Sequence, residues 1–125
     1  MREQVRDPAG GDEQATDAAL RAIAEPRRRA ILQLVARDEM AAGEIAAAFD
    51  ITRTAVSQHL TVLKNAGLLS ERRDGTRRLY RARAEGLAGL RDFLDDMWSG
   101  ALDTARRIAE HERGAADDDR AASAG

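Results

Sequence analysis

The sequence predicts a mainly α-helical domain that carries one small β-hairpin, and three observations support this fold class. Aromatic residues make up only 3% of the 125 residues, so the core must consist mostly of Leu, Ile, Val and Ala, which favours helices. Apolar residues recur every three to four positions up to Gly67, alternate through Ala82, and then return to the helical spacing. A strong turn signal, Asp74-Gly75, divides the alternating stretch into two strands.

The length allows one folded domain with a single core, which we place at residues 15–112. Residues 1–14 combine Pro8, two glycines and several charges without periodicity, and we expect a disordered tail there. Residues 113–125 include three consecutive aspartates and are expected to form a disordered acidic tail.

Three short helices are expected before residue 50. The first begins at Ala15, the second begins with Pro26, and the third covers Gly43–Phe49. A proline is well tolerated in the first helical turn because its missing N–H has no partner there. The second helix carries three consecutive arginines, which either contact phosphate or form a solvated face: Arg27, Arg28 and Arg29.

The stretch Asp50–Leu69 predicts a tight turn followed by a helix with two different faces. Thr52 is a good N-cap, and Gly67 fits the C-terminal stop. Val56, Leu60 and Leu63 recur at i, i+4 and i+7 and point to a core. The other face contains no carboxylate and consists of Arg53, Thr54, Ser57, Gln58, Thr61 and Asn65. Such a face suits the major groove of DNA, and the alternative is an ordinary amphipathic surface helix.

The net charge of −2 conceals a strong asymmetry along the chain. Residues 51–83 carry eight basic and two acidic side chains, whereas residues 84–125 carry five and ten. A protein that touches a polyanion needs a local positive face rather than a positive total. Four arginines surround the tip of the predicted hairpin: Arg72, Arg73, Arg77 and Arg78. They favour contact with phosphate or the minor groove over the alternative, a solvated edge strand.

One long helix with a broad apolar face is expected from about Ala84 to Glu112. This is more apolar surface than a helix at the edge of a small monomer hides, and such surfaces usually mark an interface. We therefore expect a homodimer with the first and last helices at its seam; the alternative is that the long helix folds back on its own domain. The predicted interface residues are Leu20, Ile23, Leu90, Leu94, Met97, Trp98, Ala101, Leu102, Ala105 and Ile108.

The order of these elements resembles the winged helix-turn-helix of the ArsR/SmtB-type bacterial repressors. Three segments of the sequence also resemble the corresponding segments of that family. The segments are Leu20–Leu32, Thr52–Leu68 and Arg72–Tyr80. The resemblance covers roughly residues 16–112 and implies a homodimeric repressor of its own or an adjacent operon, bound to an inverted-repeat operator. It also implies that helix 53–66 enters the major groove and that the wing at 72–78 lies on the backbone or in the minor groove.

Together, the resemblance, the polar face and the basic tip give a set of expected DNA-binding residues: Thr52, Arg53, Thr54, Ser57, Gln58, His59, Thr61, Lys64, Arg72, Arg73, Thr76, Arg77 and Arg78. Arg53 and Gln58 are the best candidates for base edges, because Arg suits the paired acceptors of guanine and Gln suits adenine. Phosphate contacts are expected from Thr54, Ser57, Thr61 and Lys64, and the wing arginines are expected to add affinity without much sequence information.

The sequence departs from the metal-sensing members of the family. Those members carry a Cys-containing motif at the start of the third helix, whereas Met40–Ile45 contains no thiol and the chain has no cysteine. The last helix offers one histidine, His111, and scattered carboxylates, which make a poor transition-metal site. The resemblance is therefore to the non-metal-sensing branch, with no metal or cofactor expected. Two possibilities stay open, an unknown small-molecule effector at the dimer seam near Trp98 and control by protein level alone.

Other classes of function fit the sequence less well. It contains no Ser/His/Asp or Cys/His set and no phosphate-cradling glycine loop, which argues against an enzyme. A winged helix used only for protein–protein contact is the alternative, and the basic segment argues against it. No secretory signal is visible and no apolar run approaches the ~20 residues needed to span a bilayer. We therefore expect a cytoplasmic protein, and the resemblance implies a bacterial one that is associated with the nucleoid when it is bound to DNA.

Overall fold

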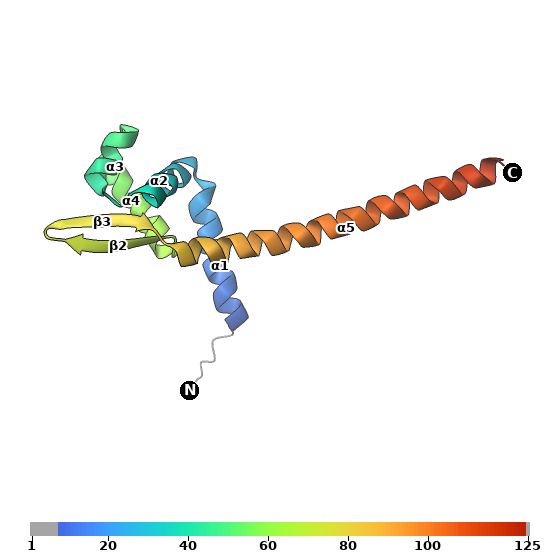
Figure 1. Ribbon diagram of the computed structural model, residues 1–125, viewed down its shortest axis with the longest axis horizontal. Coiled ribbons are helices and arrows are strands. Elements are labelled where there is room, and N and C mark those ends of the chain that lie inside the picture. The colour runs from blue at the N-terminus through green and yellow to red at the C-terminus, as the bar shows by residue number, and fades with distance from the viewer. Residues whose placement is uncertain (1–7, 125) are drawn as a thin grey trace. The chain divides into compact units, whose positions relative to one another are not determined.

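The computed structural model describes the backbone of residues 8–124, which are mainly helical with a three-stranded antiparallel sheet (Figure 1). The elements are α1 (Pro8–Ala24), α2 (Pro26–Arg37), β1 (Met40–Ala41), α3 (Ala42–Phe49), α4 (Arg53–Asn65), β2 (Leu69–Asp74), β3 (Arg77–Ala82) and α5 (Ala84–Ala124). The chain forms two compact units, which meet in sequence between Arg91 and Asp92. The predicted fold class, mainly helical with a winged helix-turn-helix, is confirmed.

Both terminal helices extend beyond their predicted bounds. α1 begins at Pro8 rather than Ala15, and α5 continues to Ala124 rather than ending near Glu112. Proline fits a first helical turn, and each interior glycine costs only about 1 kcal/mol relative to alanine. The residues after Glu112 are rich in alanine and contain no proline, so helix propensity extends α5 past the last apolar repeat. The predicted tail residues 1–7 and 125 lie outside the described part of the chain, and the domain boundaries stay a prediction.

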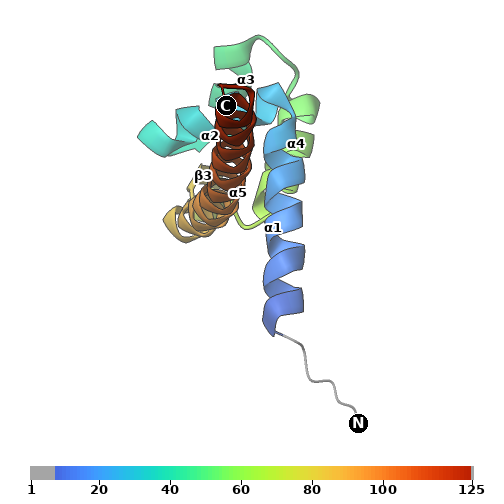
Figure 2. The same ribbon diagram turned by 90° about the vertical axis from the view of Figure 1, so that its right-hand side faces the viewer.

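The core of the first unit contains aliphatic side chains from its helices and its sheet. α1 lies beside α2 and α4 (Figure 2), and Ala19 and Ala22 of α1 are buried. The predicted inward residues of α4 are confirmed, since Val56, Leu60 and Leu63 are at most 2% exposed. The other buried side chains are Ile31, Leu32 and Val35 of α2, Ile45 and Ala46 of α3, Leu68, Leu69 and Leu79 at the sheet, and Leu90 of α5. This packing buries one side of α4 and leaves the opposite, outer face exposed.

Local signals fix both ends of α4. The Thr52 hydroxyl accepts a hydrogen bond from the Ala55 N–H at 3.1 Å, so the predicted N-cap is confirmed. At the other end Gly67 has a φ of +78°, which is costly for any residue with a Cβ. The Leu68 N–H bonds to the Leu63 carbonyl and the Gly67 N–H to the Lys64 carbonyl, as in a Schellman motif. The helix therefore begins and ends where the sequence predicts.

The sheet differs from the predicted hairpin in two respects. β3 is the central strand, because Met40 and Ala41 of β1 pair with Tyr80 and Leu79 on its outer edge. A two-residue strand is too short to show an alternating pattern, so the sequence predicts only a polar connection there. The turn lies one residue later than predicted: Asp74 pairs with Arg77, and Gly75 is the only residue of the turn with a positive φ, at +66°.

The three consecutive arginines of α2 have a role that neither sequence interpretation includes. The guanidinium of Arg28 donates to the carbonyls of Ala22 and Arg21, and that of Arg29 donates to the carbonyl of Ile23. These carbonyls lie in the last turn of α1, where backbone acceptors have no partner within the helix. Arg27 donates instead to the carbonyl of Phe49 at the end of α3. The three arginines therefore donate hydrogen bonds to the backbone carbonyls at the C-termini of α1 and α3.

The second unit is the part of α5 from Asp92 onward. Its apolar side chains are exposed within the single chain, at 51% for Met97, 63% for Trp98 and 54% for Ile108. Leu102 and Phe93 add to the same unpartnered surface. No helix among the described residues is both long enough and apolar enough to cross a membrane.

Candidate nucleic-acid interface

α4 presents three surfaces besides its buried side, and each follows from helical spacing. The outer face, opposite the core, carries exposed residues at i, i+4, i+7 and i+11: Thr54, Gln58, Thr61 and Asn65. One flank faces the hairpin of β2 and β3 and carries Arg53, Ser57 and Lys64. Arg53 and Ser57 line a cleft together with residues of β3, and Lys64 forms an ion pair with Glu71 of β2. The other flank carries Ala55, His59 and Val62.

The outer face of α4 is free of acid and largely free of internal bonds. Thr61 donates its hydroxyl hydrogen to the Ser57 carbonyl at 2.9 Å. Among the described residues, no intramolecular hydrogen bond occupies the Gln58 side chain. Gln58 thus presents both a donor and an acceptor to solvent, the combination that reads adenine in the major groove.

The turn between α3 and α4 sets the angle of the two helices. Asp50 has a left-handed backbone with a φ of +54°, which Asp tolerates better than most residues with a Cβ. The next residue, Ile51, donates its N–H to the Ala46 carbonyl at 3.2 Å and closes the end of α3. This arrangement places the N-terminus of α4 at the surface, where the first residues of a recognition helix meet base edges.

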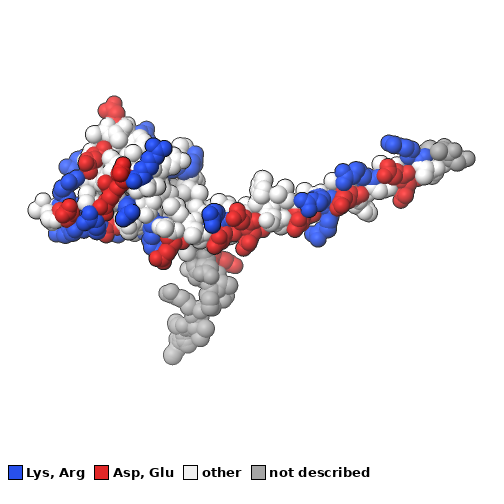
Figure 3. All heavy atoms as spheres, viewed as in Figure 1, with Lys and Arg blue, Asp and Glu red and all other residues white. Residues whose placement is uncertain are grey.

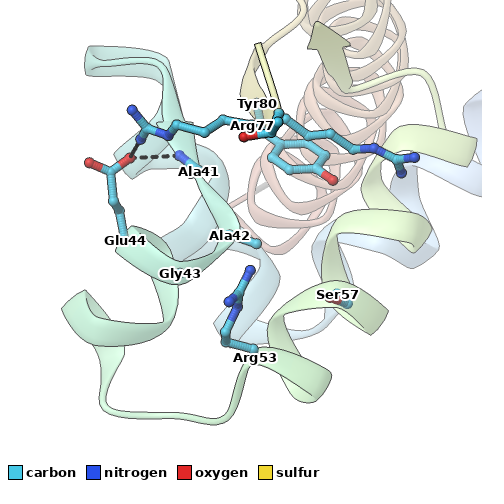
Figure 4. Close-up of a pocket in the computed structure, with 10 residues that line it drawn as sticks. Ala41, Ala42, Gly43, Glu44, Arg53, Ser57, Arg77 and Tyr80 are labelled. Atoms are coloured by element: carbon cyan, nitrogen blue, oxygen red, sulfur yellow. Dashed lines mark hydrogen bonds and ion pairs between the residues drawn. The ribbon is translucent and has the colours of Figure 1, made fainter. Parts of the chain in front are cut away.

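An open cleft of ≈ 600 Å³ lies where α3, α4 and β3 meet (Figure 4). Its lining is mostly polar and comprises Ala41, Ala42, Gly43, Glu44, Arg53, Ser57, Thr76, Arg77, Arg78 and Tyr80. The Arg53 guanidinium lies over Gly43 at the start of α3, with its Cζ 3.8 Å from the position that a Cβ of residue 43 would occupy. The cleft therefore brings the predicted base-reading arginine together with the predicted wing.

Most of the basic side chains of the wing have acidic partners, and basic and acidic groups are interleaved over this end of the unit (Figure 3). Arg72 donates two hydrogen bonds to the carboxylate of Glu39, both at 2.7 Å. Arg77 donates to Glu44 at 2.9 Å, and the same Glu44 oxygen accepts from the Ala41 N–H at the start of α3. Arg73 has no ion pair within the described residues.

Glu71 lies between two cations. One of its oxygens accepts from Lys64 of α4, and the other lies 3.4 Å from Arg78 of β3. The hydrogen bond from Lys64 holds the pKa of Glu71 below its ordinary value of 4.5. Likewise, the hydrogen bond from Arg72 lowers the pKa of Glu39, and Glu39 raises the pKa of Arg72. These pairs link the wing to α4 and to the connection before β1.

The lowered pKa of Glu39 gives a testable pH dependence of stability. A carboxylate whose folded pKa lies below its unfolded value stabilises the fold above the unfolded pKa of about 4.5, and this contribution is lost as the pH falls through the lower folded pKa. The Glu39→Gln variant is therefore expected to melt below wild type at neutral pH, and the two melting temperatures are expected to converge as the pH falls below the unfolded pKa and through the lowered folded pKa of Glu39. Parallel curves for the two proteins would contradict this linkage. Glu112→Gln in α5 is the matched control.

His59 is separated from the rest of the predicted DNA-binding set. It is half-buried on the flank of α4 that faces the junction of α1 and α2, with its Nε2 3.9 Å from Glu25 Oε2. The other predicted residues of α4 lie on the outer face or the hairpin flank. The structure brings five of the thirteen predicted residues together in the cleft, namely Arg53, Ser57, Thr76, Arg77 and Arg78, and it places His59 on the opposite flank of α4. The described residues include no cluster of three His, Asp or Glu side chains that could hold a metal ion.

The sequence interpretation missed the acidic partners and the aromatic lining of this surface. Glu39, Glu44 and Glu71 each bind a cation of the predicted set, and Tyr80 lines the cleft beside Ser57. The spacing of Glu44 three residues after Ala41 was a usable signal, since a glutamate at that place commonly bonds to the first backbone N–H of a helix. The Glu39–Arg72 pair spans 33 residues and has no local signal.

A turn-linked helix pair with an acid-free outer face, beside a basic two-stranded wing, defines a winged helix-turn-helix DNA-binding protein. The sequence profile described as "Bacterial regulatory protein, arsR family" matches residues 25–71. The HTH-type transcriptional regulator Rv2034 of Mycobacterium tuberculosis is 44% identical over 77% of this chain and 90% of its own length. This chain belongs to the ArsR family, whose members are transcriptional regulators rather than enzymes.

Two further relatives extend the comparison. The transcriptional repressor SdpR of Bacillus subtilis is 44% identical over 44% of this chain and 61% of its own length. The solution structure of the homodimeric winged helix-turn-helix DNA-binding domain of Mb0332 from Mycobacterium bovis has a TM-score of 0.61 and 33% identity, covering 79% of this chain and 91% of that one. The protein is thus a DNA-binding transcriptional regulator of the ArsR family.

Proposed function

We propose that this regulator is a homodimeric repressor that binds an inverted-repeat operator in the promoter of its own or an adjacent operon. α4 enters the major groove, and the wing at residues 72–78 lies on the backbone or in the minor groove. The observation that carries the proposal is the exposed, acid-free outer face of α4 beside a cleft lined by Arg53, Arg77 and Arg78. Two relatives support it, one named as a transcriptional repressor and one described as a homodimeric DNA-binding domain.

The proposed dimer seam uses the terminal helices. In the second unit, Leu94, Met97, Ala101 and Ile108 recur at intervals of three, four and seven, the spacing of a seam between helices. Trp98 and Leu102 widen this face and are exposed in the single chain. In the first unit, Leu20 and Ile23 of α1 are half-buried, whereas Leu90 is 8% exposed within its own chain. Leu90 therefore contributes less free surface to the proposed seam than the residues that follow it.

The twofold symmetry of such a dimer sets the form of the operator. Two recognition helices in successive major grooves require half-sites about 34–36 Å apart, or roughly 10–10.5 base pairs from centre to centre. Selection of bound sequences from random DNA at a defined salt concentration tests this directly. An inverted repeat with that spacing is the expected product, and a reporter driven by the matching promoter is expected to be repressed. Absence of any enriched sequence, with no salt-dependent DNA binding, would favour the alternative function as a protein–protein interaction module.

Gln58 is proposed to read a base, and its replacement gives a specific prediction. Gln58→Ala is expected to lower discrimination at one position of each half-site by about 1–3 kcal/mol, because the side chain can no longer form a bidentate pair with adenine. Competition binding with operators mutated one position at a time measures this. Asn65→Ala, on the same face at the far end of α4, is a matched control and is expected to keep the wild-type sequence profile. A uniform loss across all operators for Gln58→Ala would show a contact to phosphate instead.

A further inference from the structure

The register of the hairpin separates the four arginines near its tip into two pairs. Residues paired across antiparallel strands share a face, and neighbours along a strand lie on opposite faces. Arg73 pairs with Arg78, so both lie on one face, together with Glu71 and its partner Tyr80. Arg72 pairs with Leu79, and Arg77 pairs with Asp74, so these two arginines lie on the other face.

The face with Arg73 and Arg78 is the one turned toward α4. Glu71 of this face bonds to Lys64 of α4, and Tyr80 lines the cleft beside Ser57. In the close-up, Tyr80 lies on the side of the cleft where α4 carries Ser57 (Figure 4). The recognition helix and this face of the wing therefore form one continuous surface.

The opposite face is tied to the protein's own carboxylates. Arg72 makes its two-bond pair with Glu39, which precedes β1. Arg77 lines the α3 side of the cleft and extends away from Tyr80 to reach Glu44 on α3 (Figure 4). Both contacts join the wing to the segment that leads into the helix-turn-helix, and a planar guanidinium that binds a carboxylate through two parallel bonds holds its direction well.

The charge balance of the two faces differs accordingly. On the side turned to α4, Arg73, Arg78 and Lys64 surround a single carboxylate, Glu71. On the other side the basic residues Arg72, Arg77 and Arg81 are matched by the acidic residues Asp74, Glu39 and Glu44. A DNA backbone is attracted to an excess of positive charge, which only the first side has.

We infer that the wing arginines divide by face: Arg73 and Arg78 contact DNA phosphates, whereas Arg72 and Arg77 are positioning residues that hold the wing through Glu39 and Glu44. The inference rests on the proposed function and refines it, because the wing was expected to contribute all four arginines to DNA. Each lost phosphate contact reduces the number of counterions released on binding, which is read from the dependence of the binding constant on salt.

The test measures the slope of log Kd against log salt for a cognate operator. Arg73→Ala and Arg78→Ala are each expected to reduce the slope by about 0.9, the value for one phosphate on duplex DNA. Arg72→Ala and Arg77→Ala are expected to keep the wild-type slope, whatever their effect on affinity. Arg120→Ala, in the C-terminal part of α5, controls for the loss of a positive charge outside the interface.

Glu39→Gln separates positioning from direct contact, because it weakens the bond to Arg72 and leaves the arginine in place. It is expected to change affinity in the same direction as Arg72→Ala and to leave the slope unchanged, with folding monitored by circular dichroism. A reduced slope for Arg72→Ala or Arg77→Ala would overturn the division, as would unchanged slopes for Arg73→Ala and Arg78→Ala. A wild-type protein without salt-dependent DNA binding would instead overturn the proposed function itself.

Discussion

Met97→Asp is expected to convert the protein into a folded monomer and to weaken operator binding by about 10²–10⁴-fold, the gain that linking two binding modules typically provides. Met97 is 51% exposed in the single chain and lies in the middle of the proposed apolar seam. An unpaired carboxylate buried at this seam would cost several kcal/mol, because a charge taken from water needs a partner. Sedimentation equilibrium and operator titration measure the two effects.

The control for this variant is Ser99→Asp, which adds the same charge to the same helix. Ser99 is exposed and lies two residues, and therefore roughly half a turn, away from Met97. It is expected to leave both the oligomeric state and operator affinity unchanged. If Met97→Asp remained dimeric with full affinity, the seam would have to lie elsewhere on the protein.

Gly86→Ala is expected to have the largest effect on stability of any alanine substitution at a described glycine of α5. A Cβ at residue 86 would lie 1.9 Å from the carbonyl oxygen of Gly67, far inside any real contact. The position of a Cβ is fixed by its own backbone, and the Gly67 carbonyl is itself backbone, so no side-chain rotation relieves the clash. We expect a loss near the upper end of the about 1–3 kcal/mol typical of overpacking, which corresponds to a fall of roughly 10–20 °C in the melting temperature.

Gly89→Ala provides the matched control, one turn further along α5. Nothing lies within 4 Å of the position of its Cβ, so the substitution meets open space. It is expected to be neutral or to stabilise the helix by up to about 1 kcal/mol, the difference in helix propensity between the two residues. Thermal unfolding of both variants, followed by circular dichroism, separates the effect of the steric clash from the effect of helix propensity. Equal melting temperatures for the two variants would contradict the close approach of Gly86 to Gly67.

The features that the sequence predicts well are those with local causes. α4 is bounded by a capping threonine and a glycine with a positive φ, and its apolar spacing identifies Val56, Leu60 and Leu63 as core residues. Each of these signals lies within a few residues of the feature that it predicts. The polar side of the helix follows from the same periodicity, which is why six of the seven predicted DNA-binding residues of α4 lie on its outer face or its hairpin flank.

The features that the sequence does not predict depend on segments that are distant in the chain. Strand β1 forms by pairing with β3, and its two residues are too few to show an alternating apolar pattern in the sequence. The sequence does not show that Arg72 has an acidic partner, because Glu39 lies 33 residues earlier and only the fold brings the two side chains together. The arginines of α2 similarly find their carbonyl partners only after α1 has packed. Tertiary contacts, rather than local propensity, decide these roles.

The two-residue strand β1 has a consequence for protein engineering. Its register with Tyr80 and Leu79 joins the start of α3 to the central strand of the wing through backbone pairs, independently of the side chains at residues 40 and 41. A ligand-binding motif grafted into this segment would therefore be coupled mechanically to the wing without redesign of the sheet. Residues 40–42 are the natural place to install an artificial input into this regulator, because Glu44 already holds Arg77 of the wing.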